Sequence, residues 1–402
     1  MPQLPGEWID AFDKTIGHYT AFLPASLPPT SGFDPLRVLA AGERAAHALG
    51  NLKALGSRLP SPELLSMFPL IREAHASARV EGTQTTLAHA FGIEDPPEEA
   101  EYRQELQAVL DHREAQAEGV RLLAKNGLDA HLLRRVHEVM FQSSASPELQ
   151  VGRWRTQQNY IPGEHPGLQY ARYVPPPPSD VPHGMEALLA FIRRREELSP
   201  LIRIGFTHAQ FELIHPFVDG NGRMGRLLII LQILDEGLLQ SPVLFLSDYF
   251  LQFRDLYFRC LDGVGRRGDW TSWLSFFLVG VEEVATAATD LAEKVLQLRQ
   301  DMLREWRKQS RGQLGIRLLE LLFEQPQITV KGATQRLQAT TAPVNELVRR
   351  FVQLGWLQQV TPGRRNRRFV FIEYWNRLSK AGQLDVAAIR RRLDAALGPG
   401  SL

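Results

Sequence analysis

The fold is decided by the stretch His215-Pro216-Phe217-Val218-Asp219-Gly220-Asn221-Gly222-Arg223-Met224-Gly225-Arg226. The mostly apolar residues before it, 201–211, and after it, 227–234, predict two helices. The stretch itself is therefore expected to be a loop that runs into the start of the second helix. Amides of 220–222 can turn inward around an anion, and the helix dipole adds positive potential at this point. The sequence thus predicts an anion-binding site between two core helices.

The side chains in this loop have the chemistry for attack on a nucleotide phosphate. His215 titrates near neutrality, which suits a general base that takes a proton from a hydroxyl. Asp219 offers a hard oxygen for a magnesium ion that keeps most of its waters. Arg223 and Arg226 are three residues apart, so we expect both to project from one side of the first turn and bind neighbouring phosphates. Phe217 is the apolar residue expected to hold the loop against the core.

This stretch resembles the signature of the Fic family, His-x-Phe-x-Asp/Glu-Gly-Asn-Gly-Arg-x-x-Arg, and every fixed position is present. The resemblance implies a mainly α fold and transfer of AMP from ATP to a Ser, Thr or Tyr hydroxyl of a target protein, or of the protein itself. His215 would then be the catalytic base, and Asp219 would hold Mg²⁺. The Asn221 side chain would help to cradle the phosphates. The implied nucleotide-binding residues of the stretch are Gly220, Asn221, Gly222, Arg223, Met224, Gly225 and Arg226.

Two other interpretations of the stretch are open. It could be a glycine-rich helix start in which His215 and Asp219 only cap the helix, although this leaves the arginine pair unexplained. It could also be a metal site built from His208, His215 and Asp219, which lacks a tight ligand pair such as His-x-x-x-His.

A second motif lies upstream, in residues 69–82, which have a proline in the first turn of a predicted helix and a glycine past its end. Ser77 and Glu81 are four apart and share a face. The pattern Ser-x-x-x-Glu-Gly resembles the inhibitory motif of a Fic subclass, which implies a salt bridge between Glu81 and Arg226. Such a pair can compete with a phosphate for the guanidinium. The alternative is an ordinary surface helix terminus.

A third segment, 151–163 with 170–178, alternates polar and apolar residues around a Pro-Gly turn and predicts a short hairpin. It resembles the Fic flap, in which Asn159, Tyr160 and Ile161 would position the target by strand addition. Residues 244–250 and 256–258 resemble the segment bordering the adenine pocket, so Tyr249 or Tyr257 would line the base. Aromatic residues at helical spacing also occur in ordinary cores.

The C-terminal part is basic: residues 311–377 hold eleven Lys or Arg residues against four Glu. Helices are expected at 315–323, 331–338 and 342–354, and strands at 327–330, 356–360 and 368–372, with a turn over 361–366. This order resembles a winged helix-turn-helix. If the module binds DNA, the helix over 342–354 would enter the major groove and the arginine-rich hairpin would contact phosphates. The alternative is contact with protein partners, including a second copy of the chain.

The length and composition of the chain limit the class of protein to which it can belong. A chain of 402 residues is long for one core, and its net charge of +1 points to no partner class. The one cysteine, Cys260, excludes an internal disulfide and fits a reducing compartment. The N-terminus resembles no secretion signal, and the apolar runs are too short to span a bilayer. We therefore expect a cytoplasmic protein that does not associate with membranes.

Together these features predict a Fic-type helical core with a small β-hairpin flap and a C-terminal winged helix. The expected parts are an N-terminal helical region (1–125, inhibitory helix at about 69–82), the core (126–280), a linker helix (281–310), the winged helix (311–378) and a C-terminal helix and tail (379–402). The predicted function is an autoinhibited protein adenylyltransferase with ATP as substrate. The alternatives are an ATP-sensing DNA-binding regulator, or a Fic enzyme that removes AMP or transfers another phosphoryl group. A homodimer is implied by the family resemblance alone.

Overall fold

The computed structural model describes residues 5–56, 67–144, 146–165, 167–195, 198–309, 312–361, 363, 367–380 and 384–398. The predicted turn over 361–366 lies mostly outside the described residues, as does Arg311. The described chain is mainly helical, as predicted.

Two central helices, α7 (Pro200–Ile214) and α8 (Asn221–Asp235), carry the signature loop between them. Both are apolar on nearly all sides, and a helix of that kind is stable only when other elements surround it. Shorter elements near them are α3 (Leu87–Ala90), α9 (Ser247–Gln252) and 3-10 turns at Pro147–Leu149 and Leu168–Tyr170. The longer surrounding helices are α2 (Met67–Val80), α4 (Ala100–Asn126), α5 (Ala130–Met140), α6 (Val181–Arg193) and α10 (Arg254–Arg267).

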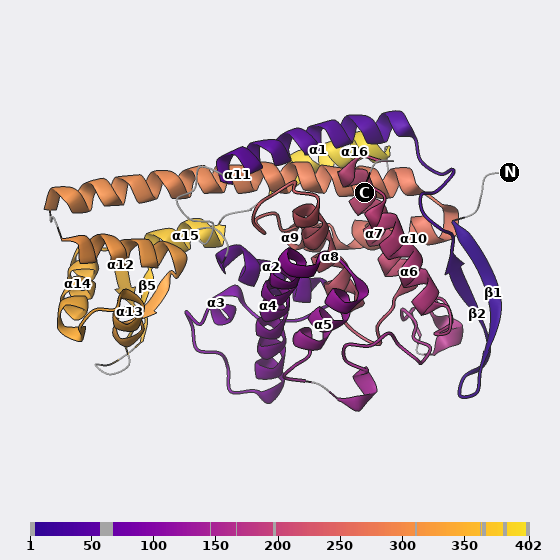
Figure 1. The fold of residues 1–402 in the computed structure, drawn as a ribbon, viewed down its shortest axis with the longest axis horizontal. Helices are drawn as coiled ribbons and strands as arrows, with labels where there is room; N and C mark the ends of the chain where they lie inside the picture. The colour runs from indigo at the N-terminus through magenta and orange to yellow at the C-terminus, as the bar shows by residue number, and fades with distance from the viewer. Residues whose placement is uncertain are drawn as a thin grey trace.

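The long helix α11 (Trp270–Gln309) connects the two parts of the molecule (Figure 1). Its 40 residues span about 60 Å. Its first half belongs to the core that contains α7, while residues from Ala292 onward pack with the C-terminal module. The predicted boundary between core and linker helix at 280/281 therefore falls inside one continuous helix. Helices α1 (Pro35–Gly56) and α16 (Val386–Leu397) pack along it. No helix in the described part of the chain is long and apolar enough to cross a membrane.

The C-terminal module has the element order that the sequence predicts. It consists of α12 (Gln313–Glu324), β3 (Gln327–Thr329), α13 (Val330–Leu337), α14 (Thr341–Gln353), β4 (Leu357–Gln359) and β5 (Arg368–Phe371). The strands form an antiparallel sheet in the order β3-β5-β4, with Ile328 opposite Phe369 and Gln358 opposite Val370. One further helix, α15 (Ile372–Lys380), was not predicted.

Several basic residues of this module bind groups within the chain. Arg336 pairs with Glu324, Arg349 pairs with Glu346, and Arg367 donates to Asn345 Oδ1. Exposed pairs of this kind are weak, so they do not prevent binding to an anionic partner. DNA binding by this module stays a prediction.

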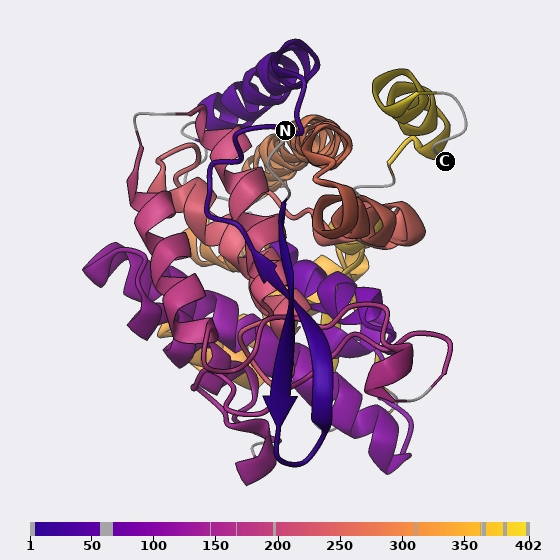
Figure 2. The ribbon, with the colours of Figure 1, turned by 90° about the vertical axis from the view of Figure 1, so that its right-hand side faces the viewer.

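The N-terminal hairpin is an element that the sequence analysis missed. Strands β1 (Gly6–Asp13) and β2 (Gly17–Pro24) pair antiparallel with Trp8 opposite Phe22, and Figure 2 shows the hairpin crossing the near face. The predicted flap hairpin is reduced to one antiparallel bridge between Ile161 and Tyr173. Prolines at 162 and 175–178 explain the difference, because proline cannot donate a hydrogen bond to a strand ladder.

Close packing at Gly280 in α11 supports a stability prediction. A Cβ added at Gly280 would lie 2.5 Å from a ring carbon of Tyr249, whose side chain is fully buried. We expect Gly280→Ala to lower the free energy of unfolding by about 1–3 kcal/mol through overpacking. The matched control is Gly42→Ala in α1, where the nearest atom is 4.0 Å away. That change should raise stability by about 0.5–1 kcal/mol, because alanine favours helix over glycine. Urea unfolding of both variants checks this, and equal effects would contradict it.

Candidate active site

The signature loop is held in one shape by the chain itself. His215 ends α7 in the left-handed region at φ 52°, and Gly220 precedes α8 at φ 78°. Between them Phe217 is fully buried. The Asn221 side chain accepts a hydrogen bond from the Phe217 N–H and donates one to the Phe217 carbonyl, each at 2.8 Å. Asn221, which is 2% exposed, therefore shapes the loop. Asn221 also lines the cavity, and a role of its side chain in binding phosphates stays a prediction.

The ring of His215 is oriented so that one nitrogen is available as a base. Its Nδ1 lies 3.3 Å from the Glu212 carbonyl. Because a carbonyl can only accept, this contact places the proton on Nδ1 and leaves the lone pair on Nε2. Burial lowers the pKa of His215 to about 4, so the ring is neutral at pH 7. A neutral imidazole with a free Nε2 can take a proton from a hydroxyl.

The N-terminus of α8 faces the same cavity as His215. No side chain caps the helix, so amides of its first turn lack an intrahelical partner. Asp219 is largely exposed, and its Oδ1 accepts from the Gly220 N–H at 2.6 Å. A single exposed carboxylate fits Mg²⁺, which usually takes one or two carboxylates together with substrate phosphates. The described residues contain no cluster of three His, Cys, Asp or Glu that could hold a metal by itself.

The two arginines leave the same turn of α8 but contact different helices. The Arg223 guanidinium lies 4.7 Å from the centre of the Phe141 ring and 3.6 Å from Asp219 Oδ2. Arg226 is 2% exposed and points to α2. The two arginines therefore do not face one phosphate site together, as we expected, because Arg226 is bound to α2 in this structure.

The partners of Arg226 are the two residues of the upstream motif. Its Nε donates to Ser77 Oγ at 2.8 Å, and its terminal nitrogen donates to the Ser77 carbonyl at 2.9 Å and to Glu81 Oε1 at 2.7 Å. Burial raises the pKa of Glu81, but the attraction of Arg226 outweighs it and the pKa is lowered. The carboxylate also lies against Gly222, where an added Cβ would be 2.3 Å from Oε1. Glu81 therefore occupies the start of α8, where an anion is expected.

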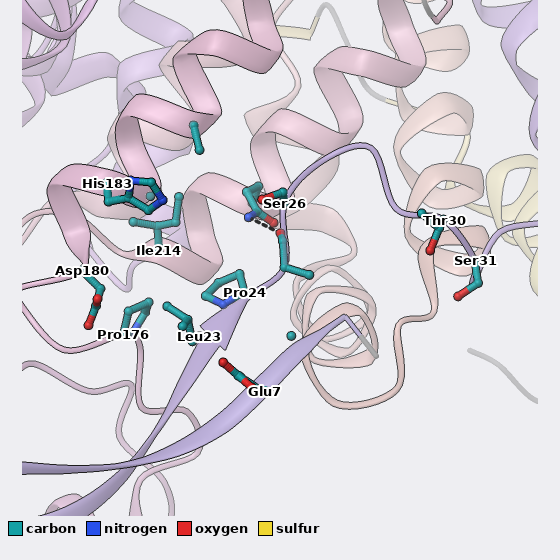
Figure 3. Close-up of a pocket in the computed structure, with 15 residues that line it drawn as sticks. Glu7, Leu23, Pro24, Ser26, Thr30, Ser31, Pro176, Asp180, His183 and Ile214 are labelled. Carbon is teal, nitrogen blue, oxygen red and sulfur yellow. Dashed lines mark hydrogen bonds between the residues drawn. The ribbon is translucent and has the colours of Figure 1, made fainter. Parts of the chain in front are cut away.

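These groups surround a cavity of about 650 Å³. The end of α2, one face of α4 and the signature loop form its walls, and His215, Asp219, Gly222 and Arg223 line it. Tyr160 of the flap segment lies at the same cavity. A larger cavity of about 910 Å³, shown in Figure 3, lies beside Pro24, His183 and Ile214 and contains none of the predicted catalytic side chains. The chemistry therefore belongs to the smaller cavity.

Other predicted nucleotide-binding residues lie in the core. Tyr249 donates to the Phe276 carbonyl at 3.0 Å, and the Tyr257 hydroxyl lies 2.9 Å from His208 Nε2; both tyrosines are at most 1% exposed. Met224 is also fully buried. Gly225 provides room for Glu212, since a Cβ there would be 2.1 Å from Glu212 Oε1. Helically spaced aromatics fill the core here, so neither tyrosine lines the cavity in this structure.

The flap segment is tied to the signature loop. Asn159 Nδ2 donates to the Phe217 carbonyl at 2.9 Å. Ile161 N–H donates to the Tyr173 carbonyl at 2.8 Å and forms the bridge described above. Tyr160 between them is 37% exposed. The segment lies beside the cavity through Tyr160, and its role in target binding stays a prediction.

Sequence reasoning missed two residues that support the loop. Arg155 is buried and donates to the carbonyls of His215 at 2.8 Å and Pro176 at 2.6 Å. His137 stacks on Phe217 at 3.9 Å between ring centres and lies 3.0 Å from the Asp219 carbonyl. A histidine on the apolar face of α5 was the available signal for His137. Arg155 had no local signal for its support of the loop, because the His215 and Pro176 carbonyls that it binds are 60 and 21 residues away in the chain.

Comparison with known proteins supports this site. Residues 127–233 match the Fic/DOC family, and residues 39–121 match its N-terminal region. A probable protein adenylyltransferase of Aquifex aeolicus is 38% identical over 69 residues, which cover 17% of this chain and 22% of that protein. Protein adenylyltransferase fic-1 of Caenorhabditis elegans is 31% identical over 91 residues, covering 22% of this chain and 16% of that protein. The chain thus matches only about a fifth of the length of these curated relatives.

Solved structures share the fold over a longer part of the chain. A Fic family protein from Desulfovibrio desulfuricans aligns with a TM-score of 0.54 and 21% identity, covering 86% of this chain and 98% of that one. The structure of Fic-1 from C. elegans aligns with a TM-score of 0.50 and 20% identity, and the alignment covers 66% of this chain and 75% of that chain. The signature loop and helices α2, α5, α6 and α7 lie within the regions that match the family. Residues 39–121 and 127–233, which contain the inhibitory motif and the signature loop, therefore match the Fic/DOC family, and the chain shares the fold of the solved Fic structures.

Proposed function

We propose that the protein is a protein adenylyltransferase that transfers AMP from ATP to a hydroxyl of a protein target. One observation carries the proposal: the free Nε2 of neutral His215 and the uncapped start of α8 face one cavity. A base and an anion site side by side are what nucleophilic attack on a phosphate requires. The names of the curated relatives support the same reaction.

In the proposed reaction, His215 Nε2 takes the proton from the target hydroxyl as its oxygen bonds to the α-phosphorus of ATP. The bond from that phosphorus to the β-phosphate oxygen breaks, and pyrophosphate leaves. Amides at 220–222 and the arginines at 223 and 226 neutralise the phosphate charge. Asp219 would hold Mg²⁺, which supplies further positive charge to the phosphates.

We infer that the structure represents an inhibited state. The Glu81 carboxylate lies at the start of α8 and engages Arg226, so ATP phosphates would have to displace it from both. Two anions cannot share this position without strong repulsion. Because Arg226 is buried against Ser77 and paired with the partly exposed Glu81, its guanidinium is not free to bind a phosphate until Glu81 moves.

We expect His215→Ala to abolish transfer while leaving ATP binding largely intact, because the ring supplies the base and the α8 amides remain. Incubation with α-³²P-ATP, γ-³²P-ATP and magnesium, in the presence and absence of EDTA, measures protein labelling. Label from the α position alone is expected for wild type. Label from the γ position would indicate phosphorylation instead, and retained labelling in His215→Ala would refute the assignment of the base.

We expect Glu81→Gly and the milder Glu81→Gln to raise self-labelling by about tenfold or more, since each removes the anion that holds Arg226. The matched control is Glu101→Gln, which removes a carboxylate that lines the same cavity from α4. Initial rates with α-³²P-ATP should rise in the Glu81 variants and stay near wild type in the control. An equal rise in all three would mean that general cavity charge, rather than the Arg226 pair, limits the reaction.

A further inference from the structure

We propose that the C-terminal module, α12 to α15, restrains the inhibitory helix α2, so that displacement of this module activates the enzyme. The inference rests on the proposed function and adds a regulatory contact to it. Figure 1 shows the module at one end of the molecule, beside α3 and α2. Neither the predicted inhibitory motif nor the predicted winged helix implies a contact between them.

The module binds the segment that follows the inhibitory helix. Arg368 of β5 donates to the Gly92 carbonyl at 2.9 Å and to Asp95 Oδ1 at 2.6 Å. Gln327 of β3 donates to the same Gly92 carbonyl at 2.7 Å. The Phe91 ring meets the Trp375 ring edge to face, with 5.2 Å between centres. Two strands and a helix of the module therefore converge on residues 91–95.

This bound segment is rigidly connected to Glu81. Phe91 ends α3, which Thr86 caps by accepting from the His89 N–H at 3.2 Å. His75 of α2 contacts the Thr85 carbonyl at 2.7 Å, and that carbonyl can only accept. Residues 83–86 also contact α4, where the Glu105 carboxylate and the Tyr102 hydroxyl accept from N–H groups of 84 and 86. A shift of residues 91–95 therefore reaches α2 through residues 83–86, which contact His75 and follow Glu81 in the chain.

A second contact joins the module to the body of α2. Arg72 donates to the Leu378 carbonyl of α15 at 3.3 Å and pairs with Asp248 of α9 at 2.6 Å. Arg72 thus lies between the module and the catalytic core on the helix that carries Ser77 and Glu81. Since α2 is joined to the module through Arg72 and, by way of residues 83–95, through His75, we infer that its position depends on the docked module.

The test uses full-length protein and the variant Arg368→Glu, which removes the hydrogen bonds to Gly92 and repels Asp95. A second variant, Asp95→Lys, breaks the same contact from an exposed position outside the module. Arg349→Glu is the matched control: it makes the same charge change in α14, where Arg349 contacts only Glu346 among the described pairs. Each variant is made alone and together with Glu81→Gly.

Two measurements are made on each protein: the initial rate of self-labelling from α-³²P-ATP, and amide hydrogen exchange over residues 77–82. We expect Arg368→Glu to raise both by about threefold to tenfold, which corresponds to loss of a partly exposed pair and its hydrogen bonds. Asp95→Lys should do the same to a smaller extent, and Arg349→Glu should match wild type. In the Glu81→Gly background the Arg368 change should add nothing to labelling.

Wild-type labelling and exchange in Arg368→Glu and Asp95→Lys, with an active Glu81→Gly, would overturn the coupling and leave the proposed function intact. An equal increase in the Glu81→Gly background would also overturn it, because the effect would not pass through Glu81. If no variant labels at all, the proposed function fails, and hydrogen exchange still decides whether the module restrains α2.

Discussion

The buried guanidinium of Arg226 is the group around which the catalytic half of the molecule is arranged. A buried cation is costly unless it is paired and hydrogen bonded, and Ser77 and Glu81 supply both. This requirement brings α2 against the first turn of α8, although some 145 residues separate the two partners in the chain. Removing one partner leaves the other charge uncompensated, so the inhibitory contact and the packing of α2 are parts of the same interaction.

The signature loop contains side chains that contact the cavity and other side chains that hold the loop in its shape. His215, Asp219 and Arg223 line the cavity, whereas Phe217 is buried beneath it. Asn221 reaches the cavity wall but has both ends of its amide bonded to Phe217. The loop carbonyls are held from below by Arg155, His137 and Asn159, which come from other parts of the fold. Such supports allow the left-handed backbone at His215 to persist and keep the ring aimed at the cavity.

The long helix α11 extends from the catalytic core to the C-terminal module at the other end of the molecule. Its residues from Trp270 to Ala285 are mostly buried in the catalytic core, and its second half presents an apolar stripe to the C-terminal module. The module is thereby fixed close to residues 91–95 and α2. The second half of α11 thus keeps the module beside the segment that follows the inhibitory helix, where the contacts of Arg368 and Arg72 form.

The sequence alone determined the elements and the chemistry that are local in the chain. Apolar runs on both sides of 215–226 predicted α7 and α8, and the spacing of charged residues within the loop predicted the base and the anion site. The family resemblance also implied the Glu81–Arg226 pair, which the structure contains. Tertiary structure decided which side chains reach the cavity. Tyr249 and Tyr257 are buried because neighbouring helices pack around them. Arg155 and His137 support the signature loop through contacts with backbone carbonyls that are distant in the chain. Such choices depend on packing between segments far apart in the chain, which periodicity and spacing do not encode.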